Sequence, residues 1–419
     1  MSDRPSRMVR GPGLPEATPF QRLGRVHALM IAGEAIMAVS LADSLFLSIS
    51  PDAARTQVIL FLAMSMAPFA LLAPLIAPFL DKIKGGQRLV VMMVALARAA
   101  VMIAMMNYYD SLAIFPLAFG ALVLSKTYAI SKSALVPTTV KSEKALVEAN
   151  SRLGQIAGIV GFMAVVPAGI IQFVSTEATL FMSAVVFVVA FFNAIKLPKV
   201  RIADKPVEEL EWQELHSPEV LRAARTMMIL RGTTGFMFFH LAFWLRTEIA
   251  GTVWFGVAIG FASLCTLIAN FVAPNLRERM KVENMLLLSV ALVAVGGLLS
   301  GFSGRFFAGI LLAGVVNAAA AIGKLAFEAT VQSGAPDANR GRAFARFETT
   351  NQLAWVLAGL IPVVLTPSGS RGFYMVGIAG VIGCVYFWRA ANSEGWKKQR
   401  RGSTGSRVSQ AINRVRRSR

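Results

Sequence analysis

The chain has 419 residues, of which 55% are hydrophobic and only 16% are charged, and its formal net charge is +19. Soluble globular domains carry about 25% charged residues, so this composition excludes an ordinary soluble protein and indicates one that lies in lipid. Only two cysteines occur, Cys265 and Cys384, and both lie in apolar stretches. A disulfide framework and a cysteine metal cluster are therefore excluded, and we expect no metal site.

Twelve apolar stretches run along the chain, and each is close to the ~20 residues that a helix needs to cross a bilayer. The first six lie at about 26–49, 56–80, 89–108, 111–130, 150–174 and 178–195. The second six lie at about 224–246, 251–275, 284–303, 305–327, 347–366 and 371–389. Helices are expected because every backbone polar group must be hydrogen-bonded inside the bilayer. We therefore predict an all-α polytopic membrane protein with twelve transmembrane helices.

A short sequence recurs at the same place in both sets of apolar stretches. Ala77-Pro-Phe-Leu-Asp follows the second stretch, and Ala273-Pro-Asn-Leu-Arg follows the eighth, 196 residues later. Both copies consist of Ala-Pro-x-Leu followed by charged residues. The repeat indicates two six-helix pseudo-repeats around a central cavity, which is a transporter architecture.

This division predicts five regions along the chain. They are a cytoplasmic arm at 1–24, a first half at 25–196, an amphipathic linker at 197–222, a second half at 223–389 and a basic tail at 390–419. The linker contains Ser217-Pro218, which is typical of a helix N-cap followed by proline at the first helical position. The tail either attracts anionic lipid of the inner leaflet or is a solvated topology anchor.

Basic residues are distributed very unequally between the two sides of these stretches. Of the 42 Lys and Arg residues, 37 fall on one side, four fall on the other and Arg98 lies inside the third stretch. Positive charge stays in the cytoplasm, so both termini are expected there, in a multi-pass protein of the cell (inner or plasma) membrane. The same distribution favours a lipid bilayer as partner over nucleic acid, and we expect a monomer.

The loop after the second apolar stretch resembles the signature loop of the major facilitator superfamily, in which Gly-x-x-x-Asp-Arg/Lys is followed by glycine and basic residues. Asp81, Lys82, Gly85 and Arg88 match it, whereas Ala77 stands in place of the first glycine. The resemblance implies that the first, fourth, seventh and tenth helices line the cavity, and that the two halves rock to expose it alternately. It also implies that Asp81 holds the inner helix ends together in the outward-open state.

Two further stretches resemble the twelve-helix exporters of drugs or siderophores within this superfamily. Arg340, Gly341 and Arg342 precede the eleventh apolar stretch, where the resemblance implies a gating loop. In the fifth stretch, small residues allow close approach of helices. These residues are Gly154, Gly158 and Gly161. Drug–proton antiporters of the superfamily carry a Gly-Pro pair there, whereas Phe162 follows the last glycine in this chain.

Ionisable residues at membrane depth are costly, so each one is a candidate functional residue. The candidates for proton coupling in the cavity are Glu34, Asp43, Arg98, Arg231 and His240. Lys324 and Glu328 lie one helical turn apart on one face, which predicts a structural ion pair.

A shift of 197 residues places Glu34 on Arg231 and Asp43 on His240, so the halves carry opposite charges at matching positions. We hypothesise that Glu34 is the proton-responsive group and that Arg231 is its partner when the halves approach. His240 would tune Asp43 near neutral pH. The alternative is that all four are separate packing or topology residues, with Arg231 extending toward the inner surface.

The chain has no phosphate-binding loop, no His-Glu-x-x-His and no Gly-x-Ser-x-Gly sequence, which argues against an enzyme and against ATP as the direct energy source. The function that we predict is secondary active transport by alternating access, with proton-driven efflux of a small, largely apolar compound and no cofactor. Two alternatives remain open. One is a lipid flippase or solute importer on the same fold, and the other is a non-transporting membrane scaffold or sensor.

Overall fold

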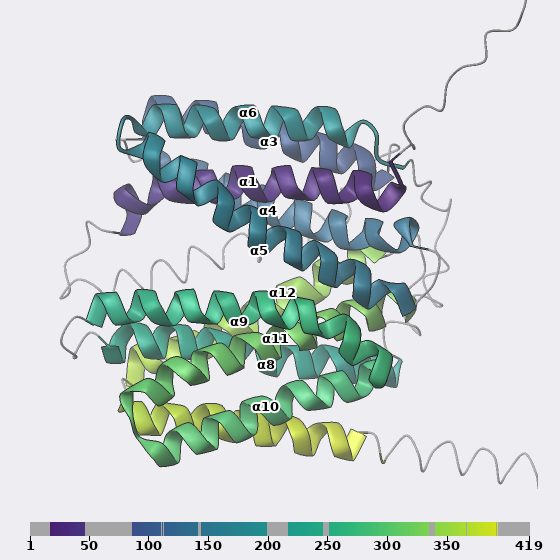
Figure 1. Cartoon of the computed structure of the whole chain (residues 1–419), viewed down its shortest axis with the longest axis vertical. Coiled ribbons are helices and arrows are strands. Elements are labelled where there is room, and N and C mark those ends of the chain that lie inside the picture. The colour runs from purple at the N-terminus through teal and green to yellow at the C-terminus, as the bar shows by residue number, and fades with distance from the viewer. Residues whose placement is uncertain are drawn as a thin grey trace, which may run out of the picture.

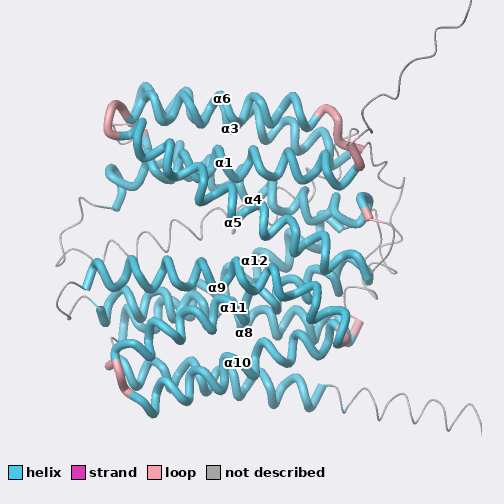
Figure 2. The backbone as a smooth tube through the Cα atoms, in the orientation of Figure 1, coloured by secondary structure: helices cyan, strands magenta, loops and turns pink. Residues whose placement is uncertain are grey.

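The computed structural model describes residues 17–46, 86–109, 111, 113–140, 144–198, 217–245, 251–334, 340–365, 367–390 and 392. The second apolar stretch, most of the signature loop with Asp81, Lys82 and Gly85, the amphipathic part of the linker and most of the basic tail lie outside these residues. The described part is helical throughout, without strands, as expected for an all-α membrane protein (Figure 2).

The helices form two halves that lie one above the other in Figure 1. The first half consists of α1 (Pro19–Phe46), α3 (Gly86–Tyr108), α4 (Ile114–Leu135), the short 3-10 helix η1 (Val136–Thr139), α5 (Lys144–Gln172) and α6 (Thr176–Ala194). The second half consists of α8 (Pro218–Trp244), α9 (Gly251–Arg279), α10 (Val282–Ser303), α11 (Phe306–Gly334), α12 (Arg340–Leu365) and a C-terminal helix, Gly369–Ala390.

Packing within each half is dense, and three pairs of helices carry most of the contact between the halves. In the first half α1 packs against α5 and α6, and α3 against α4 and α6. In the second half α8 packs against α11 and α12, and α11 also contacts α9 and α10. Between the halves α4 meets α12, while α5 meets α9 and α11.

Eight of the described helices are long and apolar enough to cross a membrane. The described helices that fall short of this are α4, α8 and α12, and each carries charged residues in its sequence. All three contribute side chains to the cavity described below. The polar composition of these helices therefore marks the interior of the protein, because a charged side chain in a membrane bundle faces the interior or a water-filled space.

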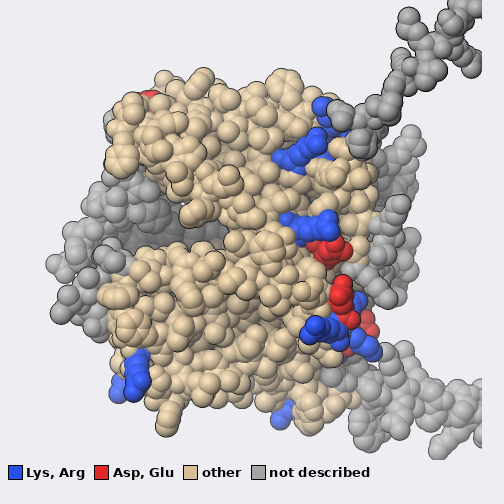
Figure 3. Space-filling view, in the orientation of Figure 1, with Lys and Arg blue, Asp and Glu red and all other residues tan. Residues whose placement is uncertain are grey.

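Several helices are longer than their apolar stretches, and the extra turns lie at the end where basic residues gather. For example, α5 begins at Lys144 and α8 begins at Pro218, about six residues before the apolar sequence that follows each start. The predicted cap at Ser217 is confirmed, because its hydroxyl accepts a hydrogen bond from the backbone N–H of Val220 at 3.4 Å. Figure 3 shows most Lys and Arg side chains of this face at one end of the bundle.

Candidate functional site

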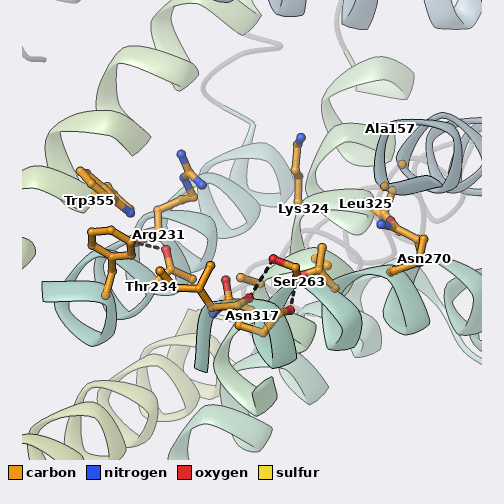
Figure 4. Close-up of a pocket in the computed structure, with 18 of the residues that line it drawn as sticks. Ala157, Arg231, Thr234, Ser263, Asn270, Asn317, Lys324, Leu325 and Trp355 are labelled. Atoms are coloured by element: carbon orange, nitrogen blue, oxygen red, sulfur yellow. Dashed lines mark hydrogen bonds between the residues drawn. The ribbon is translucent and has the colours of Figure 1, made fainter. Parts of the chain in front are cut away.

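A cavity of about 620 Å³ lies between the two halves. Side chains of α1, α4 and α5 form its first-half wall, and side chains of α8, α9, α11 and α12 form its second-half wall. The first, fourth, seventh and tenth predicted helices are α1, α4, α8 and α11, and all four contribute to the walls as the family resemblance implied. Figure 4 shows the second-half wall in close-up.

Glu34 carries the negative charge of the first-half wall, and two neighbouring helices hold it. Its Oε1 accepts a hydrogen bond from the Ser125 hydroxyl of α4 at 2.6 Å. Its Oε2 lies 3.5 Å from a guanidinium nitrogen of Arg98 in α3, a side chain that is 0% exposed, whereas the Glu34 side chain is 34% exposed. The carboxylate thus stands between a buried cation and the cavity.

The buried guanidinium of Arg98 is held mainly by this ion pair and by an aromatic ring. Its carbon atom Cζ lies 4.4 Å above the ring centroid of Phe187 in α6, a distance at which a cation is attracted to the ring face. No nitrogen of the guanidinium forms a hydrogen bond with a described residue. Phe187 approaches closely because Gly33, next to Glu34, has no side chain, and a Cβ there would lie 2.7 Å from the ring.

The second-half wall carries positive charge. Arg231 of α8 and Lys324 of α11 both line the cavity, and Figure 4 shows their side chains projecting into the same open space. Lys324 lies 3.8 Å from Glu328, one turn away, which confirms the predicted ion pair. Arg231 forms no ion pair with any described residue. The ion pair of Glu34 in this structure is with Arg98, and Arg231 faces the same cavity from the other half.

Aromatic side chains cover the part of the second-half wall next to Arg231. Phe238 of α8 lines the cavity and is 40% exposed. Its ring meets Phe255 of α9 edge to face at a centroid distance of 5.5 Å and lies 6.2 Å from the ring of Trp355 in α12. The cavity therefore offers an apolar, aromatic surface beside a cation.

Polar contacts join the halves at one end of the cavity. The side-chain amide of Asn150 in α5 donates to Oε1 of Gln332 in α11 at 2.7 Å, and Gln332 donates to the backbone carbonyl of Ser133 at 3.0 Å. Nearby, Ser151 and Gln155 of α5 both donate to the backbone carbonyl of Asn270 in α9. This end therefore holds the two halves together.

An ion pair adds to this contact between the halves. Nζ of Lys126 in α4 lies 3.2 Å from Oε1 of Glu348 in α12, and both side chains are partly exposed. Within the first half, Nδ1 of His27 and Oη of Tyr128 form a hydrogen bond of 3.0 Å, and both residues line the cavity. Toward the opposite end of the bundle the described surfaces of the two halves separate, as Figure 3 shows.

Two of the three predicted glycines of α5 lie where this helix meets α9 of the other half. A Cβ on Gly154 would lie 2.5 Å from the side-chain oxygen of Asn270, and a Cβ on Gly158 would lie 2.8 Å from Leu267. A Cβ on Gly161 would lie 3.6 Å from Ile31 of α1, which is ordinary contact. The first two glycines therefore allow close approach between the halves.

His240 lies in an aromatic cluster of the second half, and it is not among the residues that line the cavity. Its ring stacks on Trp244 and Phe236 and meets Phe373 edge to face. Its Nε2 lies 3.3 Å from the carbonyl oxygen of Gly369. The backbone of Asp43 belongs to α1, but its side chain lies outside the description, so its predicted relation to His240 stays a prediction.

The predicted loop residues are described only in part. Arg88 is half-buried in the first turn of α3, which begins at Gly86 with a φ of 66°, a conformation that favours glycine. Arg340, Gly341 and Arg342 form the first turn of α12, but their side chains are not described. Their predicted gating role therefore stays a prediction.

Sequence reasoning missed four charged or polar groups that the structure brings to the site. They are Ser125, Lys126, Lys132 and Glu348. The signal was present for the charged ones, since they lie in or beside apolar stretches, but Lys126 and Lys132 were counted with the cytoplasmic side and Glu348 was not considered. Among the described residues, no group of three or more His, Cys, Asp or Glu side chains could hold a metal ion.

Sequence comparisons find one family model that matches part of the chain and relatives that match most of it. The family model of the Major Facilitator Superfamily matches residues 246–419. The uncharacterized protein ML2143 of Mycobacterium leprae (strain TN) is 27% identical over 401 residues, which cover 84% of this chain and 68% of that protein. The uncharacterized protein Rv0876c of Mycobacterium tuberculosis (strain ATCC 25618 / H37Rv) is 27% identical over 395 residues, which cover 84% of this chain and 70% of that protein.

Solved structures with the same fold cover nearly the whole chain. A bacterial homologue of the iron transporter ferroportin, in an outward-facing state, has a TM-score of 0.68 at 14% identity, covering 89% of this chain and 99% of its own. The human organic anion transporter MFSD10 (TETRAN) has a TM-score of 0.64 at 15% identity, and the match covers 88% of this chain and 100% of that protein. The transporter FucP in the outward conformation has a TM-score of 0.61 at 11% identity, and the match covers 89% of this chain and 98% of that protein. At these identities the similarity concerns the fold.

Proposed function

We propose that this chain is a transporter of the major facilitator superfamily and that it exports a small, largely apolar compound in a proton-driven cycle. Secondary transport follows from the family and fold. The observation that carries the proton coupling is the position of Glu34, a carboxylate in the cavity wall backed by a fully buried arginine. An ionisable group at membrane depth that contacts both the cavity and the packed bundle is suited to link protonation to conformation.

Protonation of Glu34 is linked to conformation because it removes the counter-charge of Arg98. A neutral Glu34 no longer balances the charge of the guanidinium, and the contact of the cation with the ring of Phe187 remains. A buried cation without its counter-charge is costly, so protonation favours any arrangement of α1, α3 and α6 that relieves it. Since α1 lines the cavity, such a rearrangement changes how the first half meets the second.

We place the basic end of the bundle in the cytoplasm, because basic residues collect there and positive charge stays on that side. The contacts of Asn150, Gln332 and Asn270 join the halves at this end. With this orientation, contact between the halves at the cytoplasmic end supports the proposal that the cavity faces the outside of the cell. A phosphatase reporter, active only outside the cytoplasm, should be silent when fused after Arg419, and activity there would reverse the orientation.

The experiment that tests proton coupling measures efflux from proteoliposomes loaded with radiolabelled small aromatic compounds, with and without an imposed pH gradient. We expect pH-dependent efflux by the natural protein and by the control Glu219→Gln, whose carboxylate is exposed in the first turn of α8. Glu34→Gln should lose the pH dependence. Because this change leaves Arg98 unbalanced, Glu34→Gln/Arg98→Met serves as a second variant. Unchanged pH dependence in both variants would refute Glu34 as the coupling group.

A second candidate function is proton-linked uptake, and one observation favours it. The cavity walls carry Lys132, Arg231 and Lys324 against the carboxylates Glu34 and Glu328. A proton on Glu34 would add to this positive charge, so a negatively charged solute and the proton would each strengthen binding of the other. Such cooperation suits transport in the same direction, whereas exchange requires competition. The same proteoliposomes, with the gradient reversed, distinguish uptake from efflux.

A further inference from the structure

The cavity contains more positive charge than its carboxylates can balance. Glu34 is already paired with Arg98, which lies behind the wall, and Glu328 is paired with Lys324. The other two cationic side chains in the walls, Lys132 and Arg231, form no ion pair with a described residue. Both nevertheless interact electrostatically with the carboxylate of Glu348, which is itself paired with Lys126. An unpaired cation in a space of low dielectric is costly, and an anion that enters the cavity would offset that cost.

The geometry around Arg231 suits a ligand with an acidic group. Figure 4 shows its guanidinium and the ammonium group of Lys324 projecting from neighbouring helices into one space. The Thr234 hydroxyl lines the same wall but donates its proton to the backbone carbonyl of Arg231 at 2.8 Å, so the donors for an acidic group are the two cationic side chains. A planar guanidinium offers paired N–H donors that match a carboxylate or a similar acidic group.

The rest of the second-half wall suits the apolar part of such a ligand. Phe238, Phe255 and Trp355 form one aromatic surface, and Met237 lines the cavity beside them. The exposure of Phe238 to the cavity leaves apolar area that a ligand would remove from water. Arg231 and Phe238 belong to the same helix, α8, and lie about two turns apart, so one small molecule can contact both.

We propose that this cavity binds an organic anion, with its acidic group beside Arg231 and its aromatic or aliphatic body against Phe238, Phe255 and Trp355. Lys132 and Lys324 add positive charge to the same space. The proposal rests on the proposed function in one respect, that this cavity is where the transported compound binds. It does not depend on proton coupling or on the direction of transport.

The test compares three probes with one apolar body and different charges, using the purified full-length protein in detergent. The probes are 2-naphthoate, 2-naphthamide and 2-naphthylmethylammonium, and binding is measured by the rise in thermal stability across a concentration series, which yields each dissociation constant. We expect 2-naphthoate to bind about tenfold or more tightly than the amide, because a hydrogen bond to a charged group is worth that much. The ammonium probe should bind most weakly.

Matched variants separate the charge from the packing. Arg231→Gln should weaken 2-naphthoate about tenfold and leave 2-naphthamide unchanged, whereas Arg231→Lys should retain most of the preference for the anion. Arg305→Gln, an exposed arginine in the loop between α10 and α11, is the control that removes one positive charge outside the cavity. Phe238→Ala should weaken the naphthoate and the amide alike, because both share the apolar body.

Three results would overturn the proposal. They are equal affinity for all three probes, tighter binding of the ammonium probe, and an Arg231→Gln variant that retains the preference for the anion. Stabilisation by inorganic phosphate as strong as that by 2-naphthoate would refute the role of the aromatic surface. Failure of the proposed function gives a different result. If the protein binds 2-naphthoate selectively but transports no solute in proteoliposomes, the anion site is supported and the transport function is refuted.

Discussion

The two halves place opposite charges at matching positions of their first helices, and they balance these charges differently. Glu34 of α1 and Arg231 of α8 are 197 residues apart. In the first half Arg98 of α3 supplies a buried counter-charge. The shift of 197 residues places Val295 of α10 on Arg98, and the shift of 196 residues that separates the Ala-Pro-x-Leu copies places Ala294 there. Neither residue is charged, and Ala294 is 6% exposed and packs against Gly380 of the C-terminal helix. The second half therefore has no buried partner at the equivalent place.

This difference in charge pairing predicts different roles for the two halves. A charge that is paired inside its own half contributes to the packing of that half, and its loss disturbs several helices. A charge that faces the cavity without a partner contributes little to packing and remains available to a ligand. From this comparison we propose that the first half responds to protons and that the second half supplies the binding surface.

The largest expected effect comes from breaking the ion pair of the first half. Glu34→Gln leaves the Arg98 guanidinium buried without a counter-charge, so we expect a loss of about 3 kcal/mol in the free energy of unfolding. Arg231→Gln should cost under about 1 kcal/mol, because it breaks no ion pair. Thermal unfolding in detergent measures both. The double variant Glu34→Gln/Arg98→Met should recover most of the loss, and equal costs for Glu34→Gln and Arg231→Gln would remove the difference between the halves.

A smaller effect is expected where glycines allow close packing beside each charge. A Cβ on Gly33 of α1 would meet the ring of Phe187, whereas a Cβ on Gly235 of α8 would meet the backbone carbonyl of Trp355. A ring can shift more easily than a helix backbone. Overpacking usually lowers the free energy of unfolding by about 1–3 kcal/mol, and we expect Gly235→Ala to cost more than Gly33→Ala. Gly33→Ala should also weaken pH-dependent transport, since it moves Phe187 away from Arg98. Gly120→Ala, where a Cβ meets nothing within 4 Å, is the control for both.

The smallest effect concerns the ion pair that joins the halves. Lys126→Met breaks its contact with Glu348, and a partly exposed pair is worth roughly 0.2–1 kcal/mol, so the balance between open and closed forms should shift by at most about fivefold. Spin labels at Ser111 and Ser303, near the opposite end of the bundle, should report a larger share of short distances. Glu283→Gln breaks the contact with Arg222 inside the second half and should leave these distances unchanged. A shift of the same size in that variant would mean that contacts between the halves have no special role.

The sequence by itself determined the helical class, the two halves and the local contacts. Apolar stretches of membrane length and the repeated Ala-Pro-x-Leu sequence carry that information, because a chain in lipid must satisfy its backbone within each helix. The cap at Ser217 and the pair of Lys324 with Glu328 were equally predictable, since both partners lie within one turn of the same helix.

Only the tertiary structure decided which distant charges meet. The spacing of Glu34 and Asp43 along one helix fixes their relative depth, but the side on which each finds a partner depends on how α1, α3, α4 and α6 pack. That packing brings Arg98 and Ser125 to Glu34 and leaves Arg231 facing the cavity. It also places His240 among aromatic rings of its own half. Contacts of this kind join residues far apart in sequence, so no local pattern encodes them.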